Sequence, residues 1–286
     1  MADESLLFRP ATELARLVAA REVSPVELIE AALARAEEVN ADLNCFAFVH
    51  HDAARRTAAD LEQAIVSDAP LGPLAGVPVA LKDTTPTAGD RTTLGSRTHM
   101  NWVPERDGYV AAKLRAAGAV IIGKTTTPEF AHTLVTDSPL WGPTRNPWDP
   151  TRTPGGSSGG SAVAVATGCV ALAEGSDMGG SVRIPAAWCG VVGLKPGLGR
   201  IPMDVLLGLF DTISHHGPLA RTVDDARLFL ACTQGPDDAD ILSVPGPLDL
   251  DEPVVASVEG MRLALSAHRI SAGVIWSRRV QLGRPA

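Results

Sequence analysis

The first third of the chain carries apolar residues at the spacing of a helix. They recur on one face from residue 28 to residue 39. Ser24 precedes this run and is followed by proline and, three residues on, by glutamate, a capping pattern that marks a helix start. Residues 52–66 are rich in alanine and predict a second helix. We expect residues 1–70 to form a helical segment that packs on the rest of the chain.

From residue 71 onward, short apolar runs alternate with helical segments. Buried strands are predicted at 77–82, 119–122, 170–173 and 191–194, and helices at 108–117, 158–167 and 222–232. Strands that alternate with helices are typical of a sheet that helices cover on both faces. We therefore predict an α/β fold with its core in residues 71–234.

Residues 235–286 differ in composition from the rest of the chain. Four prolines and frequent acidic residues up to position 259 predict a connector. From Gly260 onward there are five arginines, no Asp or Glu, and no clean periodicity. Two interpretations stay open: a basic tail, or a longer protein that ends early here through a shifted reading frame.

Composition narrows the class of function. A net charge of −8 over 286 residues gives no basic surface for nucleic acid. No apolar run is long enough to cross a bilayer, and the acidic N-terminus lacks a signal-peptide pattern. The four cysteines stand far apart in apolar runs, so we expect reduced core residues. No acidic or histidine residues have ligand spacing, so we expect no metal and no other cofactor, and a cytoplasmic enzyme fits these features.

Two clusters rich in glycine and serine, residues 154–161 and 175–183, carry the candidate chemistry. Glycine at this density disfavours ordinary elements, but it lets backbone N–H groups come close to a ligand. Serines in the same loops add hydroxyl groups at the same place. The pattern predicts a site where a hydroxyl attacks a carbonyl and backbone amides hold the resulting oxyanion.

A serine hydroxyl needs a base, and the sequence offers two kinds. Seven histidines lie far from the clusters along the chain, and none sits in a local signature. Lys82 ends the apolar run 77–82, where burial would lower the pKa of the amine and let it accept a proton. In the alternative interpretation, Lys82 reaches solvent from the end of the strand or pairs with Asp83.

These features together resemble the amidase signature family. The resemblance runs from about residue 5 to about residue 265, and its most specific parts are Lys82, PGGSSGGS at 154–161, GSDMGGSVR at 175–183, and the segments 184–196 and 216–226. It implies a mixed sheet of the amidase signature type, covered by helices on both faces. Members of the family are usually much longer, so the resemblance also implies that the C-terminal half of the fold is missing.

The resemblance implies a Ser–cis-Ser–Lys triad. By motif position, Ser181 is the nucleophile, Ser157 is the bridging serine after a cis peptide bond, and Lys82 is the base. The oxyanion hole is expected to consist of the backbone N–H groups of Met178, Gly179, Gly180 and Ser181. Three more residues are expected to support the loops through hydrogen bonds: Ser158, Asp177 and Arg183.

Two other motifs compete with this interpretation. Residues 118–125 match the phosphate-loop pattern GxxxxGKT, but the residues between the glycines form the predicted strand themselves, and Thr-Thr-Pro opposes a following helix. The glycines around Ser157 and Ser158 match the nucleophile elbow of Ser-His-Asp esterases. That elbow must follow an apolar strand, whereas a polar segment with two prolines precedes these serines.

We predict that the chain hydrolyses a carboxylic amide through a serine acyl-enzyme. The expected partner is a small-molecule amide, with no direct nucleic-acid partner, no membrane, and a homodimer as an option. Two alternatives stay open. The family includes the A subunit of glutamine-dependent tRNA amidotransferases, and a chain without the C-terminal half could be an inactive fragment.

Overall fold

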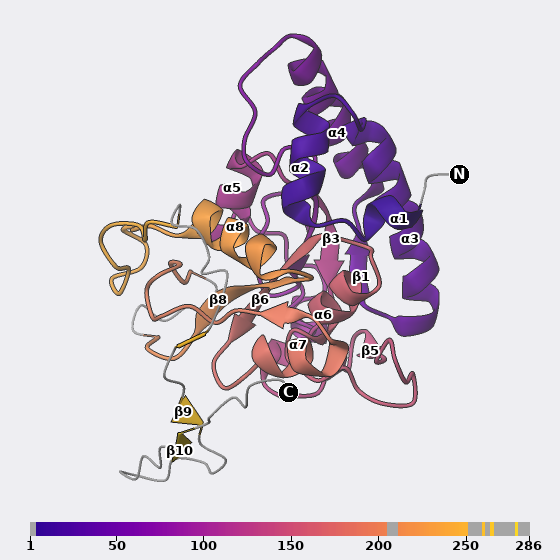
Figure 1. Cartoon of the computed structure of the whole chain (residues 1–286). Helices are drawn as coiled ribbons and strands as arrows, with labels where there is room; N and C mark the ends of the chain where they lie inside the picture. The colour runs from indigo at the N-terminus through magenta and orange to yellow at the C-terminus, as the bar shows by residue number, and fades with distance from the viewer. Residues whose placement is uncertain (1–3, 205–210, 251–258, 261–263, 266–277, 280–286) are drawn as a thin grey trace, which may run out of the picture. The chain divides into compact units, whose positions relative to one another are not determined.

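The computed structural model describes residues 4–204, 211–250, 259–260, 264–265 and 278–279 (Figure 1). Contacts divide the chain into two units, residues 1–248 and 249–286. In the second unit, β9 (Ala264–Leu265) pairs antiparallel with β10 (Arg278–Arg279). Most of the predicted basic tail lies outside the described residues.

The first unit is built on a six-stranded mixed sheet. Its strands are β1 (Phe46–Val49), β2 (Pro78–Lys82), β3 (Val120–Thr125), β6 (Leu172–Asp177), β7 (Val192–Gly193) and β8 (His215–Ala220). They lie in the order β1-β3-β2-β6-β8-β7. The central strands β3, β2 and β6 run parallel, while β1, β8 and β7 each pair antiparallel with a neighbour. The predicted α/β class is confirmed.

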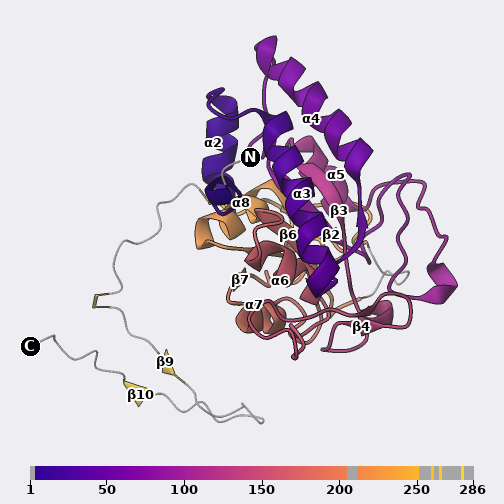
Figure 2. The ribbon, with the colours of Figure 1, turned by 90° about the vertical axis from the view of Figure 1, so that its right-hand side faces the viewer.

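The helices of this unit are α1 (Glu4–Leu7), α2 (Ala11–Ala19), α3 (Pro25–Leu43), α4 (His51–Val66), α5 (Tyr109–Ala116), α6 (Gly159–Ala166), α7 (Arg183–Cys189) and α8 (Val223–Thr233). Short elements complete it: the 3₁₀ turns Arg97–His99 and Glu129–Ala131, and a hairpin of β4 (Asp137–Ser138) and β5 (Gly142–Pro143). Helices α3 and α4 lie side by side (Figure 2). None of the described helices is both long and apolar enough to cross a membrane.

Helices cover both faces of the sheet, and the chain connections explain why. The β2–α5–β3 crossover moves one strand along the sheet, and β3–α6–β6 moves back past β2 in the opposite direction. Since crossovers between parallel strands are right-handed, two that run in opposite directions place their helices on opposite faces. Helices α5 and α6 therefore lie on different sides of the sheet, and α8 packs against α5.

Local sequence signals set several boundaries as predicted. The Ser24 hydroxyl accepts hydrogen bonds from the N–H groups of Val26 and Glu27, which begins α3. The Thr222 hydroxyl accepts from the N–H of Asp225 at the start of α8.

The cysteines differ in burial. Cys45, Cys169 and Cys189 are buried and Cys232 is partly buried, all as free thiols. Three of the four cysteines thus lie in the core as expected, and their reduced state stays a prediction.

Other elements differ from the sequence prediction. Strand β6 does not stop before the second cluster but continues into it as far as Asp177. The segment predicted as a buried strand at 191–194 is a half-buried edge strand of two residues. Helix α7 begins at Arg183, the last residue of the second cluster, and its Pro185 stands in the first turn, where proline is tolerated.

The parallel strands bring both clusters to one edge of the sheet. Lys82 ends β2, Asp177 ends the adjacent parallel strand β6, and α6 starts within the first cluster. In α/β sheets, ligands bind outside the carboxyl ends of the strands. The candidate residues therefore meet where such a fold usually places a site.

Candidate active site

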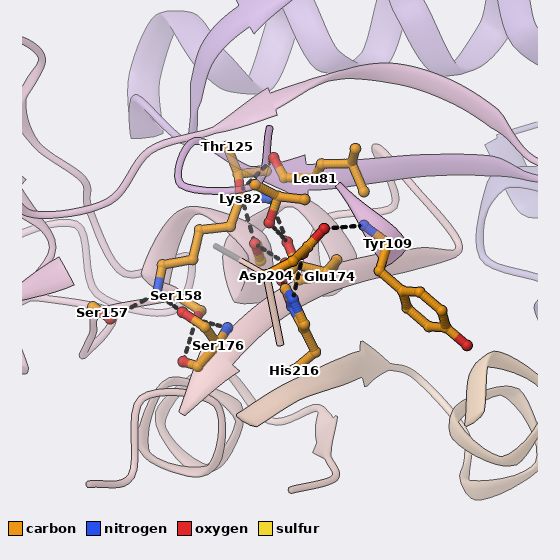
Figure 3. A network of polar contacts seen from close by, with 12 residues as sticks. Leu81, Lys82, Tyr109, Thr125, Ser157, Ser158, Glu174, Ser176, Asp204 and His216 are labelled. Carbon is orange, nitrogen blue, oxygen red and sulfur yellow. Dashed lines mark hydrogen bonds and ion pairs between the residues drawn. The ribbon is translucent and has the colours of Figure 1, made fainter. Parts of the chain in front are cut away.

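Lys82 lies at the carboxyl end of β2 with 0% of its surface exposed. Its Nζ lies 2.6 Å from the Oγ of Ser157 and 3.0 Å from the Oγ of Ser176 (Figure 3). Burial lowers the pKa of Lys82 to about 7, although the charges of Glu174 and Asp177 act in the opposite direction. An amine with this pKa is about half neutral near pH 7, so it can accept a proton from a neighbouring hydroxyl.

The structure excludes the alternatives considered for Lys82. The side chain does not reach solvent. Asp83 is also buried and bonds to Thr93 instead, whose N–H donates to Oδ1 at 2.9 Å and whose hydroxyl donates to Oδ2. The only side chains to which Lys82 Nζ donates, within the described part of the chain, are the two serines.

Ser157 and Ser158 stand in the loop before α6 and tie the two clusters together. The peptide bond between Gly156 and Ser157 is cis. The N–H of Ser158 donates to the carbonyl of Ser181 at 3.1 Å. The Ser158 hydroxyl donates to the carbonyl of Ser176 at 3.3 Å and accepts from the Ser176 N–H at 3.2 Å. The first loop is thereby fixed both to β6 and to the loop that carries Ser181.

Asp177 organises the turn that leads to Ser181. Arg183 donates to its two carboxylate oxygens through hydrogen bonds of 2.9 Å each. The N–H groups of Gly180 and Val182 donate to it at 2.7 and 3.1 Å. Burial alone would raise the pKa of Asp177, but these hydrogen bonds outweigh it and hold the pKa well below the ordinary range. Asp177 and Arg183 therefore shape the loop.

The turn from Met178 to Ser181 presents backbone N–H groups beside the Ser181 hydroxyl. Those of Met178, Gly179 and Ser181 have no hydrogen-bond partner among the described residues. The N–H of Gly180 donates to Asp177. Three of the four N–H groups expected for an oxyanion hole therefore have no partner within the described part of the chain, and the fourth is engaged within the loop.

A cavity of about 370 Å³ opens at this edge of the sheet. Four serines line it: Ser157, Ser176, Ser181 and Ser214. Most of the other lining side chains are apolar: Leu94, Phe130, Ala131, Met178 and Met203. No Asp, Glu, Lys or Arg lines the cavity among the residues that the structure describes. The hydroxyl groups thus face a mostly apolar space, in whose described lining His99 is the single titratable side chain.

A buried network behind Lys82 was not anticipated from the sequence. Glu174 on β6 and His216 on β8 are fully or almost fully buried, and His216 Nδ1 lies 2.8 Å from Glu174 Oε1 (Figure 3). Asp204 Oδ1 lies 3.9 Å from His216 Nε2, an ion-pair rather than a hydrogen-bond distance. The sequence did contain one signal of this network. It was a lone Glu inside an apolar strand, because a buried Glu rarely lacks a partner.

The competing motifs do not have the geometry that they require. Gly123, Lys124 and Thr125 of the phosphate-loop pattern lie inside β3, and no helix begins there. Lys124 is buried and donates to the Thr85 carbonyl and the Thr92 hydroxyl. The loop before Ser157 does not follow a strand of the central sheet, whereas a nucleophile elbow would. No group of three or more His, Cys, Asp or Glu in the described residues could hold a metal ion.

Comparison with known proteins places this site in context. A family model described as Amidase matches residues 27–275. An acylamidase of Rhodococcus erythropolis is 43% identical over 93% of this chain and 56% of its own length. The A subunit of the glutamyl-tRNA(Gln) amidotransferase of Acidothermus cellulolyticus is 45% identical over 85% of this chain and 48% of its own.

Solved structures agree with the sequence matches. The structure of a bacterial aryl acylamidase of the amidase signature enzymes superposes with a TM-score of 0.82 at 35% identity, over 85% of this chain and 51% of that one. The chain therefore spans about half the length of the relatives it matches.

Proposed function

The chain belongs to the amidase signature family, and from that premise we propose that it hydrolyses a carboxylic amide through an acyl-enzyme on Ser181. The observation that carries the proposal is the buried Lys82 amine, 2.6 Å from the Ser157 hydroxyl, beside the cavity that Ser181 lines. A neutral amine in this position can draw protons through one serine from another. This is the requirement for turning a hydroxyl into a nucleophile.

The proposed reaction moves protons along the two serines. Neutral Lys82 accepts the proton of Ser157, and Ser157 accepts the proton of Ser181. The Ser181 oxygen bonds to the carbonyl carbon of the amide, and the C–N bond then breaks as a proton returns to the leaving nitrogen. Water, activated by the same relay, hydrolyses the ester on Ser181 and restores the enzyme.

The turn from Met178 to Ser181 supplies charge stabilisation in this proposal. As the carbonyl oxygen gains negative charge, it is held by the N–H groups of Met178, Gly179 and Ser181, which are open in the described structure. The Gly180 N–H keeps the turn in shape through Asp177. The loss of one such donor typically costs about 2.7–4 kcal/mol of transition-state stabilisation.

The cavity lining favours an uncharged substrate with an apolar acyl group. Leu94, Phe130 and Met203 offer apolar contact, and no Asp, Glu, Lys or Arg of the described residues lines the space. A substrate ammonium or carboxylate buried there would lack a partner, which is costly. The acyl side of an apolar amide would instead gain from leaving water.

A second candidate is a glutaminase role like that of an amidotransferase A subunit, because one such protein is 45% identical to this chain. Glutamine carries an α-ammonium and an α-carboxylate, for which the described lining offers no Asp, Glu, Lys or Arg. Comparing the release of ammonia from glutamine and from an apolar primary amide such as hexanamide separates the two. We expect hexanamide to be the better substrate.

A fluorophosphonate probe tests the proposed nucleophile directly. We expect it to label the chain once, at Ser181, as read by peptide mapping with mass spectrometry. Ser181→Ala should abolish labelling, and Ser67→Ala, an exposed serine at the end of α4, serves as the matched control that keeps it. Labelling at Ser157 or Ser158, or none on a folded sample, contradicts the proposal.

Two further expectations from the sequence, a homodimer and a cytoplasmic location, stay predictions.

A further inference from the structure

We propose that Glu174 and His216 form a buried positioning pair for Lys82. Glu174 fixes the main chain of the lysine, and His216 balances the negative charge that Glu174 brings. The proposal rests on the proposed function, because it concerns the base of that reaction. Neither side chain is among the described residues that line the cavity, so the pair acts through Lys82 and not on the substrate.

Glu174 replaces a backbone contact at the point where Lys82 leaves the sheet. The pairing between β2 and β6 ends at Ala80 and Ala173. Beyond it, the N–H of Lys82 donates to Glu174 Oε2 at 3.0 Å instead of to a strand carbonyl. The hydroxyl of Thr85 donates to the same oxygen at 2.9 Å. One carboxylate oxygen thus holds the end of β2 and the turn that follows it.

A carboxylate with no exposed surface needs a compensating charge, and His216 supplies it. Burial alone would raise the pKa of Glu174, but the hydrogen bond and charge of His216 outweigh it and hold the pKa below its ordinary value. Burial alone would lower the pKa of His216, but Asp204 and Glu174 outweigh it and raise that pKa to about 9. At neutral pH the two side chains are therefore a carboxylate and an imidazolium.

The charged groups that face these residues come from several elements. Glu174 and Asp177 on β6 face the Lys82 amine. Lys124 on β3 also faces Glu174, and it faces three aspartates as well: Asp83, Asp90 and Asp107. Asp204 faces the far side of His216 and is held by the Tyr109 N–H at 2.6 Å. Two carboxylates thus act on the Lys82 amine: Asp177 is paired with Arg183, and Glu174 is paired with His216.

This arrangement sets how easily Lys82 gives up its proton. The negative charge of Glu174 favours the ammonium form of Lys82, which cannot act as a base. The positive charge of His216 offsets that effect while Glu174 keeps its grip on the main chain. Removal of the imidazolium alone should leave Glu174 uncompensated and Lys82 more basic, whereas removal of the carboxylate charge should act in the opposite direction.

The titration of Lys82 can be measured without any substrate. The chain has four lysines, Lys82, Lys113, Lys124 and Lys195, so ¹³Cε-labelled lysine gives few NMR signals, and Lys82→Met assigns the one of interest. In His216→Asn, which keeps a donor near Nδ1 without its charge, the titration midpoint of Lys82 should rise by about one pH unit. In Glu174→Gln it should fall, and in the double variant it should lie between the two.

The sign of these shifts decides the proposal. A pair with only a packing role would lower thermal stability and leave the midpoint in place. Midpoints that stay within about 0.3 pH unit of the wild type in both single variants, or that move in the same direction, overturn the proposal. If His216→Asn does not fold, Glu174→Gln carries the test alone, and an unmoved midpoint there has the same meaning.

A second measurement links the pair to the reaction. The rate of phosphonate labelling at Ser181 should have its acidic limb displaced in His216→Asn by the same shift as the Lys82 midpoint. Its plateau at high pH should stay within about threefold of the wild type, since the base is then neutral in both. If wild-type Ser181 is not labelled, the proposed function fails, while the NMR titration still decides the role of the pair.

Discussion

The Nζ of Lys82 lies 2.6 Å from the Oγ of Ser157, and neither residue is more than 1% exposed. Water cannot solvate the amine there, so its charged form is disfavoured and its only described partners are hydroxyl groups. The contact places an amine that is about half neutral near pH 7 within hydrogen-bond reach of the Ser157 hydroxyl. Reactivity, pH dependence and part of the folding stability should therefore all depend on this contact.

Replacement of the amine should stop the reaction. We expect Lys82→Met to lower the rate of phosphonate labelling at Ser181 by about 10²–10⁴-fold, because the Ser157 proton then has no acceptor. Lys124→Met is the matched control, since it removes an equally buried amine that donates to Thr85 and Thr92 instead. A similar loss in both variants would mean that a general packing defect is responsible.

Activity should rise with pH through the titration of Lys82. Only the neutral amine accepts a proton, and the pKa of Lys82 is lowered to about 7, so labelling and amide hydrolysis should gain most between about pH 6 and pH 8. The measurement is the dependence of kcat/KM, or of the labelling rate, on pH. An acidic limb near pH 10, the ordinary lysine range, would show that the amine is not desolvated in solution.

The same shift should appear in stability. The folded pKa of about 7 lies below that of about 10.4 in the unfolded chain, so between these values the unfolded chain binds the extra proton. The free energy of unfolding should therefore rise more steeply with pH across this window in the wild type than in Lys82→Met, which keeps every other titrating group. The free energy of unfolding of the wild type minus that of the variant should increase by about 3–5 kcal/mol between pH 6 and pH 10, as measured by denaturant unfolding.

Close packing of α6 at the site should make Gly160 irreplaceable. A Cβ at Gly160 would lie 2.6 Å from the carbonyl oxygen of Cys45 and from the amide nitrogen of Thr126. We expect Gly160→Ala to destabilise the fold by about 1–3 kcal/mol, since the main chain at Cys45 and Thr126 must move. Gly179→Ala meets no atom within 4 Å and should unfold at the temperature of the wild type. Equal melting temperatures for both variants would contradict this packing.

Local features of the sequence were sufficient for much of the fold. Ser24 and Thr222 set helix starts because a capping hydroxyl acts on its own next residues, within one turn. Strand β8 was not anticipated, because His-His-Gly-Pro-Leu-Ala shows no alternation and includes residues that disfavour strands. Its place beside β6 comes from a register across distant segments, and no local rule encodes that.

The kinds of chemical group at this site follow from the amino-acid sequence alone: a lysine at the end of an apolar strand, and serines in glycine-rich loops, where backbone amides can come close. Which of these groups meet depends on the folded chain. In the fold, the Lys82 amine contacts the Ser157 hydroxyl, and the Gly180 N–H donates to Asp177. Glu174 contacts His216, which is 42 residues away along the chain. The reason is that burial and hydrogen-bond partners depend on neighbours in space, which a linear pattern does not specify.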